Sequence, residues 1–127
     1  MEPGRDAGKE GRCALPPLAY VDEPPSKAVL TGASATVRGW AFAEYVGVAR
    51  VDVLVDGRPV AEARYGLAAP QVRGQWPMSQ DPGHPNVGFE ADVPLDDLAP
   101  GIHRLSLRVT GRDDRQRELA RQSIETR

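Results

Sequence analysis

Ten residues near the middle of the chain carry its clearest structural pattern, Val51-Asp52-Val53-Leu54-Val55-Asp56-Gly57-Arg58-Pro59-Val60. The valines at 51, 53 and 55 recur with period two, the spacing that puts side chains on one face of a β-strand. Asp56-Gly57 follows at once, and this dipeptide favours a tight hairpin turn because such a turn needs positive φ angles. The stretch therefore predicts a strand, a two-residue turn and a return strand.

The same alternation recurs on both sides of this hairpin. In the segment 35–42, small apolar residues share one face, while Trp40 and Phe42 lie on the other. We therefore expect this strand to make contacts on both of its faces. Two further apolar rows follow the hairpin, with Phe89 and Leu107 at their centres. Both of these side chains are predicted to be buried between two sheets.

Turn signals separate the strands at short intervals. A first strand is expected around 18–21, extending toward residue 30, and six more follow it. The last of them, 115–124, is polar and is expected at the edge of a sheet. This pattern predicts an all-β fold, an immunoglobulin-like antiparallel β-sandwich of about seven strands. The two-cysteine signature of antibody domains is absent, because the chain has one cysteine.

The composition fits a single folded domain and argues against one class of partner. The chain has 127 residues, of which 40% are hydrophobic and 27% charged, as is ordinary for a globular protein. Its 16 basic residues stand against 18 acidic ones, giving a net charge of -2. Because a nucleic-acid binder presents a basic face to phosphates, we expect no nucleic acid as a partner.

The N-terminal residues differ from the rest of the chain. Residues 1–15 are rich in glycine and charge and lack hydrophobic periodicity, so they are predicted to be a disordered lead. The remainder, 16–127, is predicted to be one immunoglobulin-like domain. The longest apolar run near the start, Ala14 to Val21, is broken by two prolines and is too short to span a membrane, so no membrane insertion is predicted. The opening residues lack the apolar core of a signal peptide. Cys13 is interpreted as an incidental thiol. The sequence does not indicate in which cellular compartment the protein acts.

Three pieces of the chain together resemble a known family. They are Val37-Arg38-Gly39-Trp40-Ala41-Phe42, the hairpin stretch quoted above, and Gly88-Phe89 followed by Pro100-Gly101-Ile102-His103-Arg104-Leu105. In this order they resemble bacterial immunoglobulin-like domains of the GWA…VDG…GF…GxH type, over about 18–124. The resemblance implies a sandwich without a shared catalytic site, in a cell-envelope or secreted context. It assigns no binding or catalytic residue to this chain.

Few side chains suggest catalysis or metal binding. His103 begins an inward-facing row directly after a turn, where an imidazole is expected to pack and to bond a loop carbonyl. His84 is interpreted as a solvated loop residue. No paired histidines, CxxC motif, GxSxG elbow or phosphate-binding glycine loop occurs in the sequence. We therefore predict no catalytic residue, no metal site and no cofactor, and a protein that is not an enzyme.

The segment 66–86 is a long stretch without a strand pattern, and it holds the candidate binding residues. Four prolines restrict its backbone, and the first of them is expected to open a short helical turn. In one interpretation, Trp76 docks on the sandwich and fastens this crossover to the sheet. In the other, Trp76 forms a partner-facing platform with Arg73, Gln75 and Gln80, since rigid aromatic residues ringed by polar ones make binding hot spots.

Two functions from different classes stay open at this point. The leading interpretation is a non-catalytic interaction module that binds a protein or cell-envelope components through loops and sheet edges. The alternative is a carbohydrate-binding module that uses Trp76 and neighbouring loop residues, because exposed tryptophans stack on sugar rings. An exposed indole flanked by planar polar groups favours the alternative, and an indole docked into the core favours a scaffold role.

Overall fold

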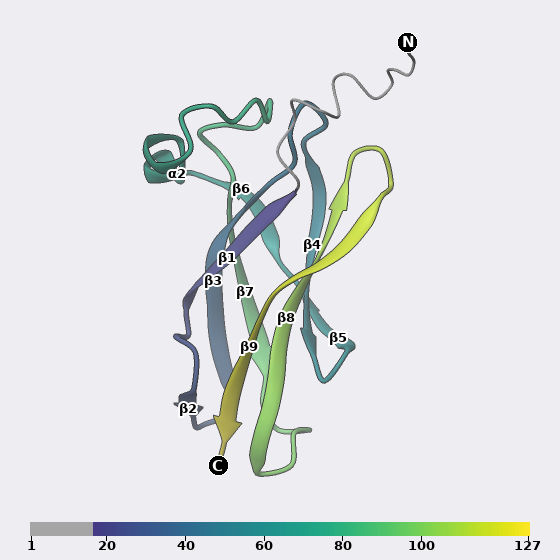
Figure 1. The fold of residues 1–127 in the computed structure, drawn as a ribbon. Helices are drawn as coiled ribbons and strands as arrows, with labels where there is room; N and C mark the ends of the chain where they lie inside the picture. Colours follow the sequence, from purple (N-terminus) through teal and green to yellow (C-terminus); the bar gives the residue numbers. More distant parts are fainter. Residues whose placement is uncertain (1–16) are drawn as a thin grey trace.

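The computed structural model describes residues 17–127, which form two β-sheets and one short helix (Figure 1). The predicted N-terminal lead, 1–15, and Cys13 within it lie outside the described residues. The elements in chain order are β1 (Leu18–Glu23), β2 (Ala28–Leu30), β3 (Ser34–Phe42), β4 (Val48–Val55), β5 (Arg58–Glu62), β6 (Arg64–Leu67), α2 (Pro70–Gln75), β7 (Gly88–Pro94), β8 (Gly101–Gly111) and β9 (Gln116–Thr126).

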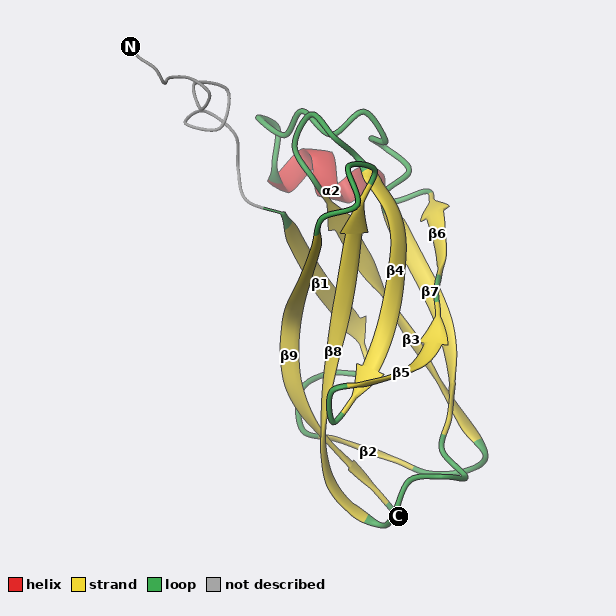
Figure 2. Ribbon diagram, turned by 90° about the vertical axis from the view of Figure 1, so that its right-hand side faces the viewer, coloured by secondary structure: helices red, strands yellow, loops and turns green. Residues whose placement is uncertain are grey.

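The two sheets pack face to face, and α2 and the long loops gather at one end of the molecule (Figure 2). The four-stranded sheet has the order β1-β3-β7-β6, and the five-stranded sheet has the order β2-β9-β8-β4-β5. The described strand pairs are antiparallel except for β2 with β9, which run parallel. The predicted all-β, immunoglobulin-like sandwich is confirmed.

Residues 17–127 form nine strands where about seven were predicted, because two predicted strands divide between the sheets. The first predicted strand, around 18–21 and extending toward residue 30, divides into β1 and β2. It leaves the four-stranded sheet after Glu23, because Pro24 and Pro25 lack the N–H groups that a sheet ladder requires. The return strand of the hairpin pairs with β4 as far as Glu62. It then crosses at Ala63 to the other sheet, where it pairs with β7 as β6.

The prediction that the last strand lies at a sheet edge was wrong. β9 lies between β8 and β2, since the three residues of β2 pair with its C-terminal end. A strand of three residues is too short to show hydrophobic periodicity, so its partner could not be inferred from the sequence. The edges of the five-stranded sheet are β2 and β5.

Apolar rows from the two sheets meet in one core. Val51, Val53 and Val55 of β4 are all buried in it, as the period-two pattern requires. Phe89 of β7 is 2% exposed and Leu107 of β8 is fully buried, which confirms both predictions of burial. The core therefore rests on side chains that the alternating rows place on the inner faces.

A second, smaller apolar cluster covers the outer face of the four-stranded sheet. Trp40 and Phe42 of β3 pack there with Ala69, Val72 and Val87 of the crossover between β6 and β7. The crossover contains α2, whose first residue is a proline, so the predicted short helical turn is confirmed. The C-terminal part of β3 is thus buried on both faces, as its sequence predicted.

Asp56 and His103 fasten the hairpin turn to the start of β8. Nδ1 of His103 lies 2.6 Å from Oδ2 of Asp56, and Nε2 lies 2.6 Å from the carbonyl oxygen of Ala99, the loop-carbonyl contact that was predicted. Because both ring nitrogens face acceptors, the imidazolium form donates both hydrogen bonds. The bond to Asp56 raises the pKa of His103, and the same bond, with that from the backbone N–H of Arg104, lowers the pKa of Asp56.

We expect Phe89→Ala and Leu107→Ala each to lower the free energy of unfolding by about 3 kcal/mol, through lost burial and the cavity left behind. Urea denaturation measures the change. Ile102→Ala is the matched control, because Ile102 is 71% exposed, and it should change the free energy by less than about 0.5 kcal/mol. A loss below about 1 kcal/mol at both buried sites would contradict the assignment of the inner faces.

The Asp56–His103 contact makes the stability depend on pH. The folded pKa of His103 is raised above 6.5, so its contribution is fully present below pH 6.5 and is lost as the pH rises through the folded value. The pKa of Asp56 is lowered below 3.8, so Asp56 stays ionised throughout this range. Denaturation of the native protein along a pH series crossing 6.5 should show this decline, and Asp56→Asn should flatten it. An equal decline in the variant would show that another group is responsible.

Candidate functional site

A hollow on the outer face of the four-stranded sheet is the candidate binding site. It lies between β1, β3 and α2 and has a volume of about 410 Å³. We call it the aromatic hollow, because three of the side chains that line it are aromatic. Its lining residues are Tyr20, Asp22, Trp40, Gln71, Gln75 and Trp76.

Cross-strand pairing stacks the aromatic rings at this hollow. Tyr20 of β1 pairs with Trp40 of β3, and their ring centroids lie 6.0 Å apart. Phe42, two residues further along β3, stacks on Trp40 with the centroids 5.6 Å apart and the planes 6° apart. Trp40 is 7% exposed, whereas Tyr20 in the edge strand is 55% exposed. The row of rings therefore ends in one tyrosine that is open to solvent.

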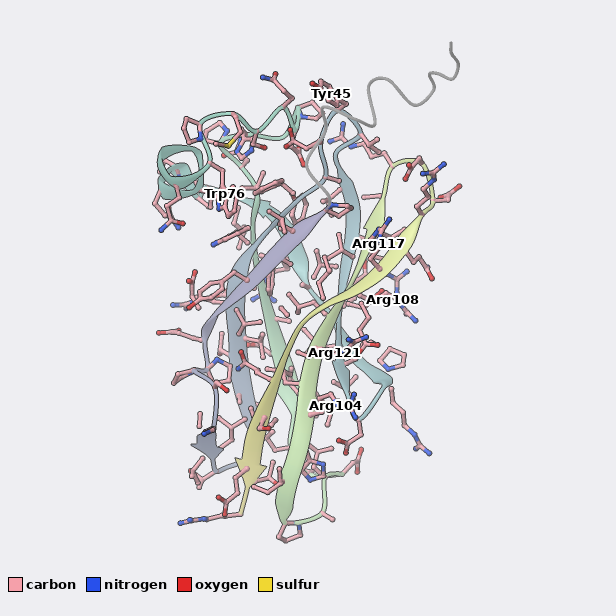
Figure 3. All side chains as sticks on the ribbon, in the orientation of Figure 1. Tyr45, Trp76, Arg104, Arg108, Arg117 and Arg121 are labelled. Atoms are coloured by element: carbon pink, nitrogen blue, oxygen red, sulfur yellow. The ribbon has the colours of Figure 1, made fainter. Side chains whose placement is uncertain are left out.

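Trp76 stands at the other side of the aromatic hollow, beside α2 (Figure 3). Its backbone N–H donates to the carbonyl of Val72 at 2.8 Å, at the C-terminal end of the helix. Its half-buried indole packs edge-on against Phe42, with the ring centroids 5.9 Å apart. Trp76 thus fastens the crossover to the sheet, as the first interpretation predicted, and its remaining surface lines the hollow.

Two glutamines and one aspartate supply polar groups to the hollow. Gln71 and Gln75 stand four residues apart in α2, so they share one side of the helix, and both are exposed. Asp22 is also exposed, and the guanidinium group of Arg38 nearby is already paired with two other carboxylates. Amide groups both donate and accept hydrogen bonds, so these side chains suit a ligand that carries hydroxyl groups.

The four residues predicted for a binding platform do not all meet. Gln75 and Trp76 line the aromatic hollow, and Arg73 lies in α2 two residues before Gln75. Gln80 lies against the loop between β3 and β4, where its backbone N–H donates to Oε2 of Glu44 at 2.8 Å. A binding role for these four residues stays a prediction.

Sequence reasoning missed Tyr20, Asp22 and Gln71. The two β1 residues lie in a short strand whose pairing with β3 is interrupted by a bulge, so no clean alternation marked an outer face. Gln71 stands four residues before Gln75, and this spacing places the two amides together once the segment is a helix. The four-residue spacing of Gln71 and Gln75 was therefore the one feature of the sequence that could have indicated a role for Gln71 at this site.

Buried polar side chains tie the crossover to the β3–β4 loop, and we call Glu44, Ser79, Asp81 and His84 the polar clasp. Oγ of Ser79 donates to Oε1 of Glu44 at 2.6 Å and lies 2.7 Å from Nε2 of His84. Oδ2 of Asp81 accepts from the backbone N–H of Ala43 at 2.7 Å. His84 is half-buried among these groups, so its interpretation as a solvated loop residue was wrong.

The polar clasp has the residue types of a hydrolytic triad in a different arrangement. In a triad the histidine stands between the serine and the acid and takes the proton of the serine. Here Ser79 stands between the other two, is fully buried, and donates its only hydroxyl proton to Glu44. The geometry therefore supports a structural role, which is to hold the crossover and its helix on the sandwich.

The opposite, five-stranded sheet carries a row of arginines along β8 and β9 (Figure 3). Arg108 lies 3.3 Å from Asp52, and Arg121 lies 3.5 Å from Glu118. These two carboxylates therefore offset the charge of Arg108 and Arg121.

Within 17–127, no three histidine, cysteine, aspartate or glutamate side chains gather as metal ligands. No helix in this range is long and apolar enough to cross a membrane.

Comparisons with known proteins bear on the fold. No protein-family model matches this chain, and no curated protein matches it. Among solved structures, it is similar to the fibronectin(III)-like modules of Clostridium thermocellum CbhA, with a TM-score of 0.53 and 18% identity over 88% of this chain and 46% of that one. A looser likeness, with a TM-score of 0.42 and 17% identity, links 85% of the chain to 92% of CopC from Methylosinus trichosporium OB3b. The chain spans less than half of the first structure, and that likeness shows an immunoglobulin-like β-sandwich fold.

Proposed function

We propose that this protein is a non-catalytic interaction module that binds a carbohydrate in the aromatic hollow. The observation that carries the proposal is the exposed ring of Tyr20 and the half-exposed indole of Trp76 in one hollow with the amides of Gln71 and Gln75. Aromatic faces pack on the apolar faces of sugar rings, and amides bond sugar hydroxyl groups.

The size of the hollow suits a ring-shaped ligand. Its volume of about 410 Å³ falls within the range of about 300–1,000 Å³ that small-molecule sites occupy. A separate hollow near Glu44 and Arg117 has about 140 Å³ and no aromatic lining residue, so it suits such a ligand less well. Two hollows beside His103, of about 450 and 490 Å³, have no tryptophan or tyrosine among their described lining residues. The aromatic lining, and not the volume, is therefore the reason to assign the carbohydrate to the aromatic hollow.

The walls of the hollow are held in place before a ligand arrives. Trp40 is nearly buried between Tyr20 and Phe42, and Trp76 rests on Phe42. The polar clasp holds the crossover from its other end. Preformed walls reduce the ordering cost of binding, which favours recognition by this surface.

A binding role, without catalysis, agrees best with the chemistry of the lining. Hydrolysis of a glycosidic bond uses a pair of carboxyl groups that flank it. Among the described residues that line the aromatic hollow, Asp22 is the one carboxylate. The motif resemblance to bacterial immunoglobulin-like domains supports a cell-envelope or secreted setting, in which glycans are abundant partners.

Protein binding through loops is the second candidate function. Tyr45 is 55% exposed and Met78 is 56% exposed, and both lie in the loops at the same end of the sandwich. Exposed aromatic and thioether side chains are common in protein interfaces. The two candidates use different side chains, so substitutions separate them.

We expect Tyr20→Ala to weaken carbohydrate binding about tenfold, which corresponds to about 1.4 kcal/mol, because the open stacking face is lost. Glycan-array screening of the native protein would identify ligands, and calorimetric titration would measure the change. Tyr45→Ala is the matched control, since Tyr45 is equally exposed and lies outside the hollow. Trp76→Phe keeps the contact with Phe42 and should weaken binding without unfolding the protein.

Equal effects of Tyr20→Ala and Tyr45→Ala would contradict the assignment of the hollow. Absence of binding to every glycan, together with capture of a protein partner that Tyr45→Ala abolishes, would favour the second candidate. Melting temperatures of all three variants should stay close to that of the native protein, which shows that changes in binding are local.

A further inference from the structure

A second hollow adjoins the aromatic hollow on the same face of the sheet. It has a volume of about 250 Å³ and shares Asp22 and Gln71 with the aromatic hollow. Its other lining residues come from β3, β7, the end of β6 and the start of the crossover, and they include Arg38 and Glu90. The two hollows therefore form one continuous groove, with Asp22 and Gln71 at the junction.

The bulge in β1 sets the place of Asp22 at this junction. Val21 pairs with Gly39 and Glu23 with Arg38, so Asp22 is the extra residue of the bulge. A bulge re-aims a side chain, and Asp22 lines both hollows. Gly39 makes this course of β1 possible, because a Cβ atom at that position would collide with the carbonyl oxygen of Tyr20.

The charges around the second hollow are unbalanced. Glu90 accepts hydrogen bonds at 2.7 Å from both Arg38 and Arg64, so the two guanidinium groups are already engaged. Asp92 and Glu23 add contacts to the same arginines, at 3.8 Å and 3.4 Å. With Asp22, four carboxylates stand against two guanidinium groups.

Asp22 is the carboxylate of this group that Arg38 and Arg64 do not pair with. Among the side chains that the structure describes, none forms an ion pair with Asp22, because Arg38 bonds to Glu23 and Glu90 instead. Partial desolvation and the neighbouring Glu23 raise the pKa of Asp22, because both oppose the negative charge of its carboxylate. A cation placed in the groove beside Asp22 would stabilise the negative charge of its carboxylate.

We propose that the groove binds a glycan that carries a free amino group, with the ammonium group against Asp22 and the adjoining sugar ring against Tyr20. The inference rests on the proposed function, and it adds the chemical class of the sugar, a hexosamine that is not acetylated. Asp22 follows Tyr20 by two residues in β1, about 7 Å along a strand, a separation that a sugar and its substituents span. Gln71 then lies beside both groups.

Other ligands fit the charges less well. A glycan with carboxylate or sulfate groups would meet the excess negative charge of the second hollow and be repelled. A neutral glycan would use the aromatic hollow and leave Asp22 unpaired. A lysine-rich peptide would satisfy Asp22, but it has no ring to place on Tyr20.

The test compares two matched ligands by calorimetric titration, an oligomer of glucosamine and an oligomer of N-acetylglucosamine of the same length. At a pH where the amine is protonated, the native protein should bind the glucosamine oligomer about tenfold more tightly. Asp22→Asn should abolish this preference and keep the binding of the acetylated oligomer. Asp92→Asn is the matched control, since it removes the same charge from the same face outside both hollows, and it should keep the preference.

The outcomes separate the two proposals. Equal binding of both oligomers by the native protein, or the same loss of preference in Asp92→Asn as in Asp22→Asn, would overturn the role of Asp22 and leave carbohydrate binding standing. Binding of neither oligomer would overturn this inference, and failure of every glycan on the array would also remove the proposed function. Tighter binding of a lysine-rich peptide than of the glucosamine oligomer would overturn the assignment to a sugar.

Discussion

Burial of both faces of β3 is the constraint on which the rest of this structure depends. The inner face of β3 contributes Val37 and Ala41 to the core between the sheets. Its outer face carries Trp40 and Phe42, which are too large and apolar to be left in water and therefore require a cover. The crossover with α2 supplies that cover. The groove follows from the same contacts, because the helix that covers the rings also forms one of its walls.

Residues of the sequence motifs serve the architecture, and some of them, such as Trp40 and Arg38, also line the groove. Asp56 of the hairpin motif and His103 of the last motif bond to each other across 47 positions. Gly39 leaves room for the backbone of β1 beside it. By contrast, Gln71 and Gln75 belong to none of the quoted motifs. These two glutamines therefore give the groove polar groups that the quoted motifs do not contain.

The crossover combines a long loop with a fixed conformation. Its prolines restrict the backbone, and the polar clasp bonds its middle to the β3–β4 loop through buried groups. Buried polar groups that are hydrogen-bonded specify one arrangement, because any other arrangement leaves a donor or acceptor unsatisfied. The walls of the groove are therefore set by the folded protein, which is the condition for selective recognition of a ring-shaped ligand.

Sequence patterns were enough to predict the fold class, the hairpin at Asp56-Gly57, the burial of Phe89 and Leu107, and the helical turn that opens the crossover. These features depend on periodicity and turn chemistry, which act between near neighbours in the chain. Packing of the whole chain set the division of two strands between the sheets, the pairing of β2 with β9, and the polar clasp. It also brought Tyr20 and Asp22 to the residues of α2. Each of these joins segments that are distant in the sequence, and their meeting depends on how the two sheets and the crossover pack.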